Sequence, residues 1–183
     1  KAFLMDAKGK KYTNWDDLVF YCKYSANPVG RFVIDLIYQK KNLQQKNFEE
    51  IYVASDCLCT SLQIINHLQD CKKDFLQLER VYIPEFFLKK HSLNKEIFYL
   101  NESHMNFFNL VHEIVEKVEI MLVKSSKGLK MIKPWGLRKE TLIILNIAKR
   151  LCYLLKIKDV LRKNVKLSRI DLIFCFIKGI IKK

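Results

Sequence analysis

The sequence has 183 residues, a length typical of one domain, and half of them are apolar, which is ample for a packed core. Its five Gly and three Pro are too few for an all-β fold with many turns, whereas abundant Leu, Ile, Lys and Glu favour helices. The six Cys form no C-x-x-C pair, which excludes a zinc ribbon or finger and favours reduced thiols packed as small apolar side chains.

The net charge of +14 resides entirely in the last third of the chain. Residues 1–123 contain 16 basic and 16 acidic side chains, whereas residues 124–183 contain 17 basic and three acidic ones. This asymmetry favours an anionic partner, namely a phosphorylated substrate, an acidic lipid surface or nucleic acid, and the alternative is a solvated basic face. No helix-turn-helix pattern or interleaving of aromatic and basic residues is present, so we expect no nucleic-acid partner.

The segments expected from the sequence are helices throughout. Asn14, with two acids in the turn that follows, predicts the start of a helix that ends near Ser25, because Pro28 disfavours helical geometry in the residue before it. The next segments are a helix from Val29 to about Gln39, a long helix from about Glu49 to Leu76, an irregular crossing segment over 80–84, and a short helix and loop over 91–101. The last ones are a helix capped by Asn101, a basic linker over 125–134, a helix over 136–156, a helical turn over 158–164, and a helix over 168–182 capped by Ser168. We therefore expect one all-α domain over residues 1–183.

Two features argue against secretion and against a membrane span. No basic segment followed by an apolar one, as in a signal peptide, follows Lys1. The longest apolar stretches are interrupted by Lys149, Arg150 and Lys178, and neither reaches the roughly 18 uncharged residues that cross a bilayer. We expect a cytoplasmic protein.

A row of polar side chains follows one face of the expected helix over 49–76. At about 100° per residue, Gln63, Asn66, Asp70 and Asp74 fall within an arc of roughly 80°, between two apolar faces. Burying an unpaired polar group is unfavourable by about 1–3 kcal/mol, so such a row needs an explanation. Two carboxylates and an amide one turn apart present the oxygen atoms that Mg²⁺ prefers. The alternative is a solvated helix face whose acids pair with the lysines of the same turn.

Two motifs at a compatible separation indicate a known family. The first is YCKYSANPVGR (21–31), and the second, one helix later, is LQIINHLQDCKKDFLQLERVYIP (62–84). They resemble the Tyr-rich Y-C-x-x-x-A-x-x-V-G segment and the Q-x-x-N-x-x-x-D-x-x-x-D motif, with its R-x-Y-x-P tail, of the squalene/phytoene synthase family of trans-isoprenoid synthases. The variant S-A-N-P-V-G-R, the lead-in N-W-D-D-L and the ending K-L-S-R-I-D-L are most similar to the bacterial, hopanoid-pathway branch of this family.

The resemblance implies an all-α bundle of the class I isoprenoid-synthase type. It implies a transferase or diphosphate lyase of the squalene or hydroxysqualene synthase kind, which ionises farnesyl or presqualene diphosphate with the assistance of Mg²⁺ in hopanoid or squalene biosynthesis. The use of NADPH stays open, and no G-x-G-x-x-G motif is present.

The resemblance also implies roles for individual residues. Asp70 and Asp74 would be metal ligands, with Asn66 assisting the metal and Gln63 assisting the metal or the diphosphate. Arg80 and Tyr82 would contact the diphosphate. Val29 and Gly30 would mark a helix break at which substrate approaches the backbone. Tyr21 would line the cavity and take part in proton or cation handling, and its alternative is a core tyrosine anchored by one hydrogen bond.

The sequence departs from the family pattern in its N-terminal part. Family members carry another Asp-rich motif tens of residues before the Tyr-rich segment, whereas the 20 residues before Tyr21 contain none. We therefore expect the C-terminal two-thirds of a family domain, inactive by itself; the alternative is a non-catalytic assembly or scaffold protein. Glu79 stands where many members have Gly, and Gln69 stands where several have an Arg that contacts diphosphate, which favours a different substrate or step.

Two further features retain two interpretations each. His67 shares the polar row, but we expect a core histidine because Mg²⁺ prefers oxygen ligands. The C-terminal helix over 168–183 is amphipathic and either lies on a membrane or docks on the bundle. Its apolar side chains are Ile170, Ile173, Phe174, Ile177, Ile180 and Ile181. In the membrane interpretation, the cytoplasmic protein binds the inner membrane face peripherally.

Overall fold

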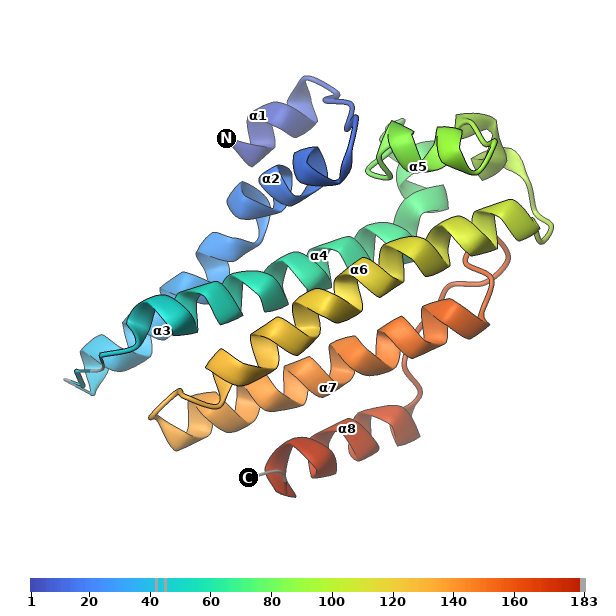
Figure 1. The fold of residues 1–183 in the computed structure, drawn as a ribbon. Helices are drawn as coiled ribbons and strands as arrows, with labels where there is room; N and C mark the ends of the chain where they lie inside the picture. The colour runs from blue at the N-terminus through green and yellow to red at the C-terminus, as the bar shows by residue number, and fades with distance from the viewer. Residues whose placement is uncertain (42, 45, 182–183) are drawn as a thin grey trace.

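The computed structural model describes residues 1–41, 43–44 and 46–181, and within these ranges the secondary structure is helical, without strands. Three long helices, α4 (Phe48–Leu78), α6 (Met105–Leu129) and α7 (Trp135–Ile157), lie side by side along the molecule (Figure 1). The shorter elements are α1 (Ala2–Ala7), α2 (Trp15–Ser25), α3 (Asn27–Lys40), α5 (Glu85–Lys90), the 3-10 helix η1 (Lys95–Tyr99) and α8 (Arg169–Ile181). The expected all-α class is confirmed.

The long helices form the middle of the bundle. α2 and α3 pack on α4, α6 packs between α4 and α7, and α8 packs on α7, so α3 and α8 lie on opposite sides of the molecule (Figure 1). The buried side chains of α6 recur every three or four residues, as in an amphipathic helix that faces a core. They include Leu110, Val111, Ile114, Val115, Val118 and Leu122. Burial of each such side chain contributes about 1.5–3 kcal/mol.

A glycine sets the closest approach of α4 and α6. A Cβ atom at Gly128 would lie 2.5 Å from the Cβ of Ala54 and 2.7 Å from the carbonyl oxygen of Glu50. Because real Cβ atoms essentially never come this close, only glycine allows the two helices to touch here.

The linker expected over 125–134 is shorter in the structure. α6 continues to Leu129, and α7 begins at Trp135.

Several predicted boundaries are confirmed by the hydrogen bonds that form them. The side chain of Asn14 accepts from the backbone N–H of Asp17 at 3.0 Å and caps α2. At α8, the Ser168 hydroxyl oxygen accepts from the N–H of Asp171 at 3.1 Å. The Asp171 carboxylate in turn accepts from the backbone N–H of Ser168 at 2.9 Å. These reciprocal bonds form a capping box in which Asp171 takes the place of the usual Glu or Gln.

Other expectations are wrong. α1 and α5 were not foreseen, because six-residue helices carry almost no periodic signal. By contrast, the helical turn expected over 158–164 is present, because the N–H of Lys163 donates to the carbonyl oxygen of Asp159 at 3.1 Å, a bond of helical spacing. Asn101 does not cap α6, which begins after His104, because its side-chain oxygen accepts from Lys72 Nζ instead.

Gly30 does not mark a helix break. It lies inside α3, and the chain breaks earlier, at Ala26 between α2 and α3, with Pro28 in the first turn of α3. A Cβ atom at Gly30 would lie 2.5 Å from Ser55 Oγ and 2.6 Å from Cys59 Sγ. Gly30 is thus required for close packing of α3 on α4 and not for a break.

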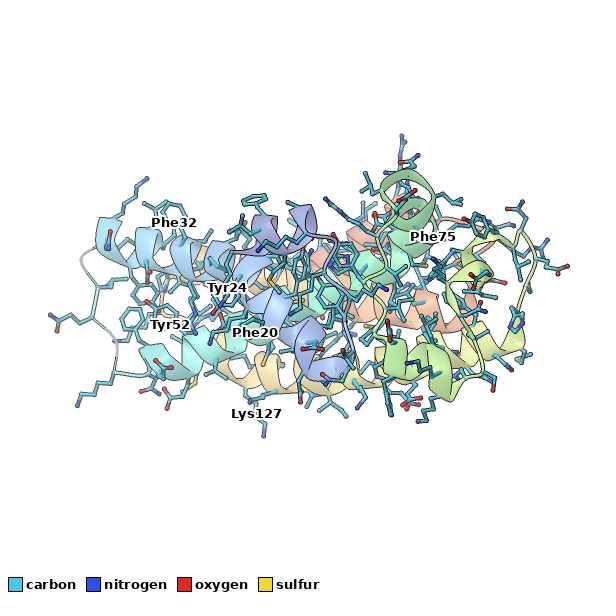
Figure 2. All side chains as sticks on the ribbon, turned by 90° about the horizontal axis from the view of Figure 1, so that it is seen from above. Phe20, Tyr24, Phe32, Tyr52, Phe75 and Lys127 are labelled. Atoms are coloured by element: carbon cyan, nitrogen blue, oxygen red, sulfur yellow. The ribbon has the colours of Figure 1, made fainter. Side chains whose placement is uncertain are left out.

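Aromatic rings lie on the outer surfaces of α2 and α3, where Phe20 and Phe32 are exposed and Tyr24 is half-buried. The rings of Phe20 and Tyr24 meet edge to face, with centroids 5.1 Å apart, on the outside of α2 (Figure 2). Phe32 of α3 is 64% exposed (Figure 2). Among the described helices, none combines the length and the apolar character needed to cross a membrane.

Candidate functional site

Three tyrosines from separate segments gather around the carboxylate of Asp6 in α1. Tyr21 of α2 donates to Asp6 Oδ2 and Tyr82 of the 79–84 segment donates to Asp6 Oδ1, each at 3.0 Å. The ring of Tyr12 stacks on that of Tyr82 and meets that of Tyr21 edge to face, with centroids 5.7 and 5.5 Å away. We call these four residues the Asp6–tyrosine cluster.

The tyrosines of this cluster are neutral hydrogen-bond donors. Burial is the largest cause that raises the pKa of Tyr12, Tyr21 and Tyr82 above the ordinary value for a phenol. For Tyr21, the hydrogen bond with Tyr82 raises the pKa further, followed by the charge of Asp6. Because a phenolate here would be desolvated beside a carboxylate, the three side chains keep their protons near neutral pH.

His67 joins this cluster to the polar row on α4. Its ring stacks on Tyr82 with centroids 3.7 Å apart, and its Nε2 atom lies 3.1 Å from Gln63 Nε2. Its Nδ1 atom lies 4.0 Å from Asp74 Oδ2. His67 is buried, which confirms the expectation of a core histidine.

The acids of the row are not paired with lysines of the same turn. Asp70 and Asp74 are half-buried, and Asn66 is exposed. Lys72 turns away from both acids and donates to the carbonyl oxygens of Leu100 and Leu161 as well as to Asn101. Within the described residues, no hydrogen bond or ion pair reaches the carboxylate of Asp70. Its negative charge is therefore available to a ligand.

Two half-buried carboxylates one helical turn apart fit a divalent cation only in part. The described ranges contain no group of three or more His, Cys, Asp or Glu that could hold a metal ion. Mg²⁺, however, commonly takes one or two protein carboxylates and completes its shell with phosphate oxygens and water. Asp70 and Asp74, with Asn66 one turn earlier, suit that mode of binding and not a closed protein cage.

The other predicted site residues are placed in two groups. Arg80 is half-buried next to the cluster, and its Nη2 atom donates to the carbonyl oxygen of Asp6 at 3.5 Å. Val29 and Gly30 lie apart, on α3: Gly30 packs against the part of α4 one to two turns before Gln63, whereas Val29 is exposed. Gln69 donates to the carbonyl oxygen of Val165 and thereby holds the segment before α8.

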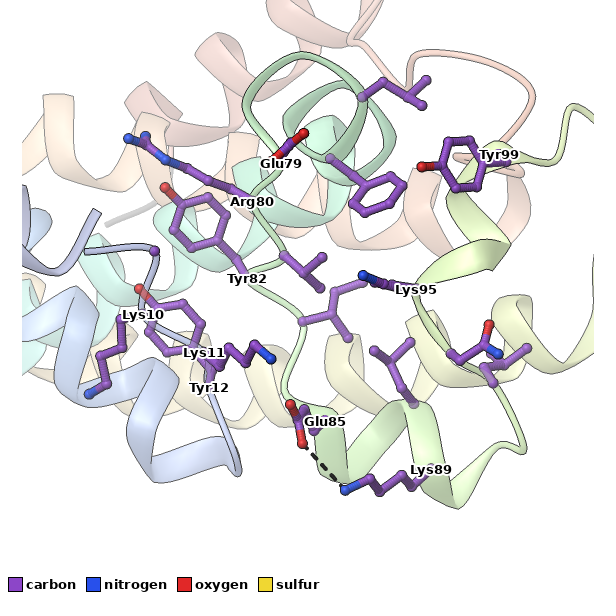
Figure 3. Close-up of a pocket in the computed structure, with 18 of the residues that line it drawn as sticks. Lys10, Lys11, Tyr12, Glu79, Arg80, Tyr82, Glu85, Lys89, Lys95 and Tyr99 are labelled. Atoms are coloured by element: carbon purple, nitrogen blue, oxygen red, sulfur yellow. Dashed lines mark hydrogen bonds and ion pairs between the residues drawn. The ribbon is translucent and has the colours of Figure 1, made fainter. Parts of the chain in front are cut away.

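A cavity of about 620 Å³ adjoins the cluster on the side of Tyr12, Arg80 and Tyr82 (Figure 3). Apolar side chains from α4, the 79–84 segment and α5 line part of it. Its remaining wall includes Lys10, Lys11 and Lys95, whereas Lys89 is paired with Glu85 at 3.3 Å (Figure 3). An apolar wall beside cationic and phenolic donors suits an amphipathic anion.

Sequence reasoning missed two members of the site, Asp6 and Tyr12. Asp6 is separated from Tyr21 by 15 residues and from Tyr82 by 76, so no local pattern connects them. The only sequence signal was the presence of a lone acid in a basic N-terminal segment, which by itself indicates nothing.

Comparison with known proteins identifies the family. The squalene/phytoene synthase profile matches residues 1–171 of this chain. The chain belongs to the squalene/phytoene synthase family. Among curated members of this family, the hydroxysqualene synthase of Sinorhizobium fredii is 38% identical over 172 residues, which are 94% of this chain and 56% of that protein. The hydroxysqualene synthase of Rhodopseudomonas palustris is 34% identical with the same coverage.

A solved structure shows the same fold. A dehydrosqualene synthase crystallised with a ligand superposes with a TM-score of 0.77 at 18% identity, over 97% of this chain and 63% of that one. The squalene/phytoene synthase resemblance and the helical-bundle fold are thus confirmed. The chain spans a little over half the length of the curated relatives that it matches.

Proposed function

We propose that this chain is the carboxylate-and-tyrosine portion of a squalene- or hydroxysqualene-type synthase, which ionises a prenyl diphosphate. The observation that carries the proposal is the carboxylate of Asp70, which no described side chain neutralises, one turn from Asp74. Asp74 has only His67 as a partner, at 4.0 Å, and like charges one turn apart repel each other, so a cationic ligand is the physical reason to keep both acids.

Different residues of the chain have different roles in the proposed reaction. Asp70, Asp74 and Asn66 hold the metal, and Mg²⁺ when bound neutralises the leaving pyrophosphate. Arg80 offers charged donors to the diphosphate. Tyr21 and Tyr82 remain neutral, with their hydroxyl groups bound to Asp6, and form an aromatic wall with Tyr12 and His67 beside the diphosphate.

Water exclusion and orientation belong to other residues of the site. The stacked rings of His67 and Tyr82 and the Gln63 amide close the inner side of the row. Exclusion of water protects a cationic intermediate from premature capture. Gln63 also assists the metal or diphosphate in this proposal.

The substrate, the pathway and the location are finer parts of the same proposal. Farnesyl or presqualene diphosphate is the substrate, and hopanoid or squalene biosynthesis is the pathway, because relatives named hydroxysqualene synthase match nearly the whole chain. The reaction takes place on the cytoplasmic side, at the inner membrane face, because prenyl chains partition into lipid. By itself, the 183-residue chain is inactive because its two carboxylates complete only part of the metal shell.

The test is Mg²⁺-dependent pyrophosphate release from farnesyl or presqualene diphosphate by the complete gene product. Asp70→Ala should lower kcat/KM by more than about a hundredfold, since even outer-sphere partners of a metal are worth about 10–100-fold. Asp16→Ala, which removes an exposed acid from the first turn of α2, is the control and should leave the rate unchanged. Undiminished release by Asp70→Ala would refute the metal assignment. Absence of release by the complete wild-type protein would favour the assembly or scaffold alternative.

A further inference from the structure

Two side chains of α4 that flank Asp70 in sequence bind a segment far along the chain. Gln69 donates to the carbonyl oxygen of Val165, and Lys72 Nζ donates to the carbonyl oxygen of Leu161 at 3.3 Å. Both acceptors belong to residues 158–168, which connect α7 to α8 and which we call the α7–α8 loop. The turn of α4 that carries Asp70 is thus tied to this loop by two side chains.

Lys72 uses its whole donor capacity in such contacts. Its ammonium group also donates to the carbonyl oxygen of Leu100 and to Asn101 Oδ1, each at 2.5 Å. An ammonium group has three N–H donors, so none remains for Asp70 or Asp74. Lys72 therefore joins α4 to two loops and leaves the negative charges of the polar row to a ligand.

The α7–α8 loop is itself held in place by the core. The side chains of Val160, Leu161 and Val165 are buried. Within the loop, the carboxylate of Asp159 accepts from the N–H of Leu161 at 2.8 Å. A segment with buried side chains and internal hydrogen bonds resists local opening, so it is a fixed support for the residues that bind it.

Gln69 and Lys72 hold α4 on one side of Asp70, and His67 holds it on the other. At about 100° per residue, Gln69 and Lys72 lie about 60° apart around the helix, and Gln69 lies about 100° from Asp70. His67 lies about 60° from Asp70 in the opposite direction, where its ring stacks on that of Tyr82. α4 therefore cannot turn about its axis at Asp70 without breaking contacts on both sides.

We propose that Gln69 and Lys72 are positioning residues of the metal site, which fix the direction of the Asp70 carboxylate by binding the α7–α8 loop. This inference rests on the proposed function, in which Asp70 and Asp74 bind Mg²⁺. Neither side chain bonds to the Asp70 carboxylate, so both act through the backbone of α4. Outer partners that orient the ligands of a metal are worth about 10–100-fold in affinity.

The test is binding of Mn²⁺ to the complete gene product, measured by the electron paramagnetic resonance signal of the free ion. Mn²⁺ takes the same oxygen ligands as Mg²⁺, and the site in question is the one that Asp70→Ala removes. Lys72→Met removes three donors at nearly constant side-chain length and should raise the Kd of this site about tenfold. Gln69→Leu removes donors without a change of charge and should raise the Kd about threefold or more.

The sign of the effect separates positioning from charge. Lys72→Met removes a positive charge from the neighbourhood of a cation site, and this change alone would strengthen the binding of Mn²⁺. Weaker binding therefore reports the loss of positioning. Lys72→Arg keeps a charged donor for the carbonyl oxygens and should bind Mn²⁺ within about threefold of the wild type.

Lys133→Met is the matched control. Lys133 Nζ also donates to a backbone carbonyl oxygen, that of Gln44 at 3.0 Å, just before the beginning of α4 and about six turns from Asp70. The substitution removes the same charge and the same kind of bond, and it should leave the Kd unchanged. Circular dichroism and thermal unfolding establish that each variant is folded, and Gln69→Leu decides the matter if Lys72→Met does not fold.

Three outcomes would overturn the inference and leave the proposed function in place, provided that Asp70→Ala loses the site. In the first, Lys72→Met and Gln69→Leu bind Mn²⁺ as tightly as the wild type. In the second, Lys72→Met and Lys133→Met weaken binding equally. In the third, Lys72→Arg binds as weakly as Lys72→Met. Equal binding by Asp70→Ala and the wild type is a different result, because it refutes the metal assignment itself and the inference with it.

Discussion

At the scale of the residue, Asp6 connects three parts of the chain that are far apart in sequence. Its two carboxylate oxygens accept from Tyr21 and Tyr82, and its backbone carbonyl accepts from Arg80. These bonds hold α1 and the 79–84 segment together and fix the orientation of both rings. Asp6 is thus the positioning residue of the candidate site, although it carries no recognisable motif.

The first prediction concerns this carboxylate. Asp6→Ala leaves two partly buried phenol groups without their acceptor and should lower the free energy of unfolding by about 2 kcal/mol. Lys8→Ala, an exposed substitution in the turn after α1, should change it by less than about 0.5 kcal/mol. Urea unfolding measures both values. Equal stabilities of the two variants would show that the hydrogen bonds to Asp6 contribute nothing.

Another residue explains a departure from the family pattern. Glu79 has φ 53°, in the left-handed region, and it forms the C-cap of α4. This conformation favours glycine, which is the residue that many family members have at this position. Glu79 adopts this conformation where α4 ends and the chain turns toward Arg80 and Tyr82.

At the scale of the element, glycines decide which helix pairs touch. Gly30 allows α3 to pack on α4, Gly128 allows α6 to pack on α4, and Gly179 allows α8 to pack on α7. At Gly128 the nearest atoms include the backbone oxygen of Glu50, which cannot rotate away as a side chain can. The arrangement of the long helices therefore depends on this position most directly.

The second prediction compares two glycines of long helices. Gly128→Ala should destabilise the protein by about 1–3 kcal/mol, because the added methyl group forces α6 away from α4. Gly136→Ala in α7 adds the same group in open space and should be neutral or stabilising by up to about 1 kcal/mol. Thermal unfolding of the two variants provides the measurement. Similar melting temperatures would contradict the close approach of α6 and α4.

At the scale of the whole molecule, the two sides of the bundle differ in charge. Residues 1–123, which carry the Asp6–tyrosine cluster, are electrically balanced, whereas residues 124–183, which include α7 and α8, have a net charge of +14. α8 also lies on the side of the molecule opposite α3 (Figure 1).

The third prediction is an acid-induced release of α8 from the bundle. Hydrogen bonds from Ser168 and Arg150 lower the pKa of Asp171 from an ordinary value of 3.8 to about 2. A lowered pKa stabilises the docked state above about pH 4, and this stabilisation is lost as the pH falls from about 4 to 2. Hydrogen exchange of α8 amides, corrected for the intrinsic effect of pH, should accelerate over this range, and Asp171→Asn should exchange faster already at pH 6. Equal protection of wild type and variant at pH 6 would refute this role of Asp171.

The sequence by itself determined the helical class, the boundaries of α2 and, to within two residues, those of α4 and α7, the family and the polar row on α4. These features depend on local patterns, since caps, apolar periodicity and motif spacing involve residues within a few turns of one another. Most of the site residues that we predicted lie on α4 or in the segment immediately after it, and for this reason they were accessible to such reasoning.

Only the tertiary structure decided the rest. Asp6 and Tyr12 joined the site through contacts across tens of residues, and Gly30 proved to be a packing position because α4 lies against it. The periodicity of α8 predicted an amphipathic helix but could not tell which side the bundle would use. The contacts with Ile143 and Arg150 place its small side against α7 and leave its large apolar side chains exposed. The local sequence pattern shows which face of a segment is apolar. Which other segment covers that face depends on the packing of the whole chain.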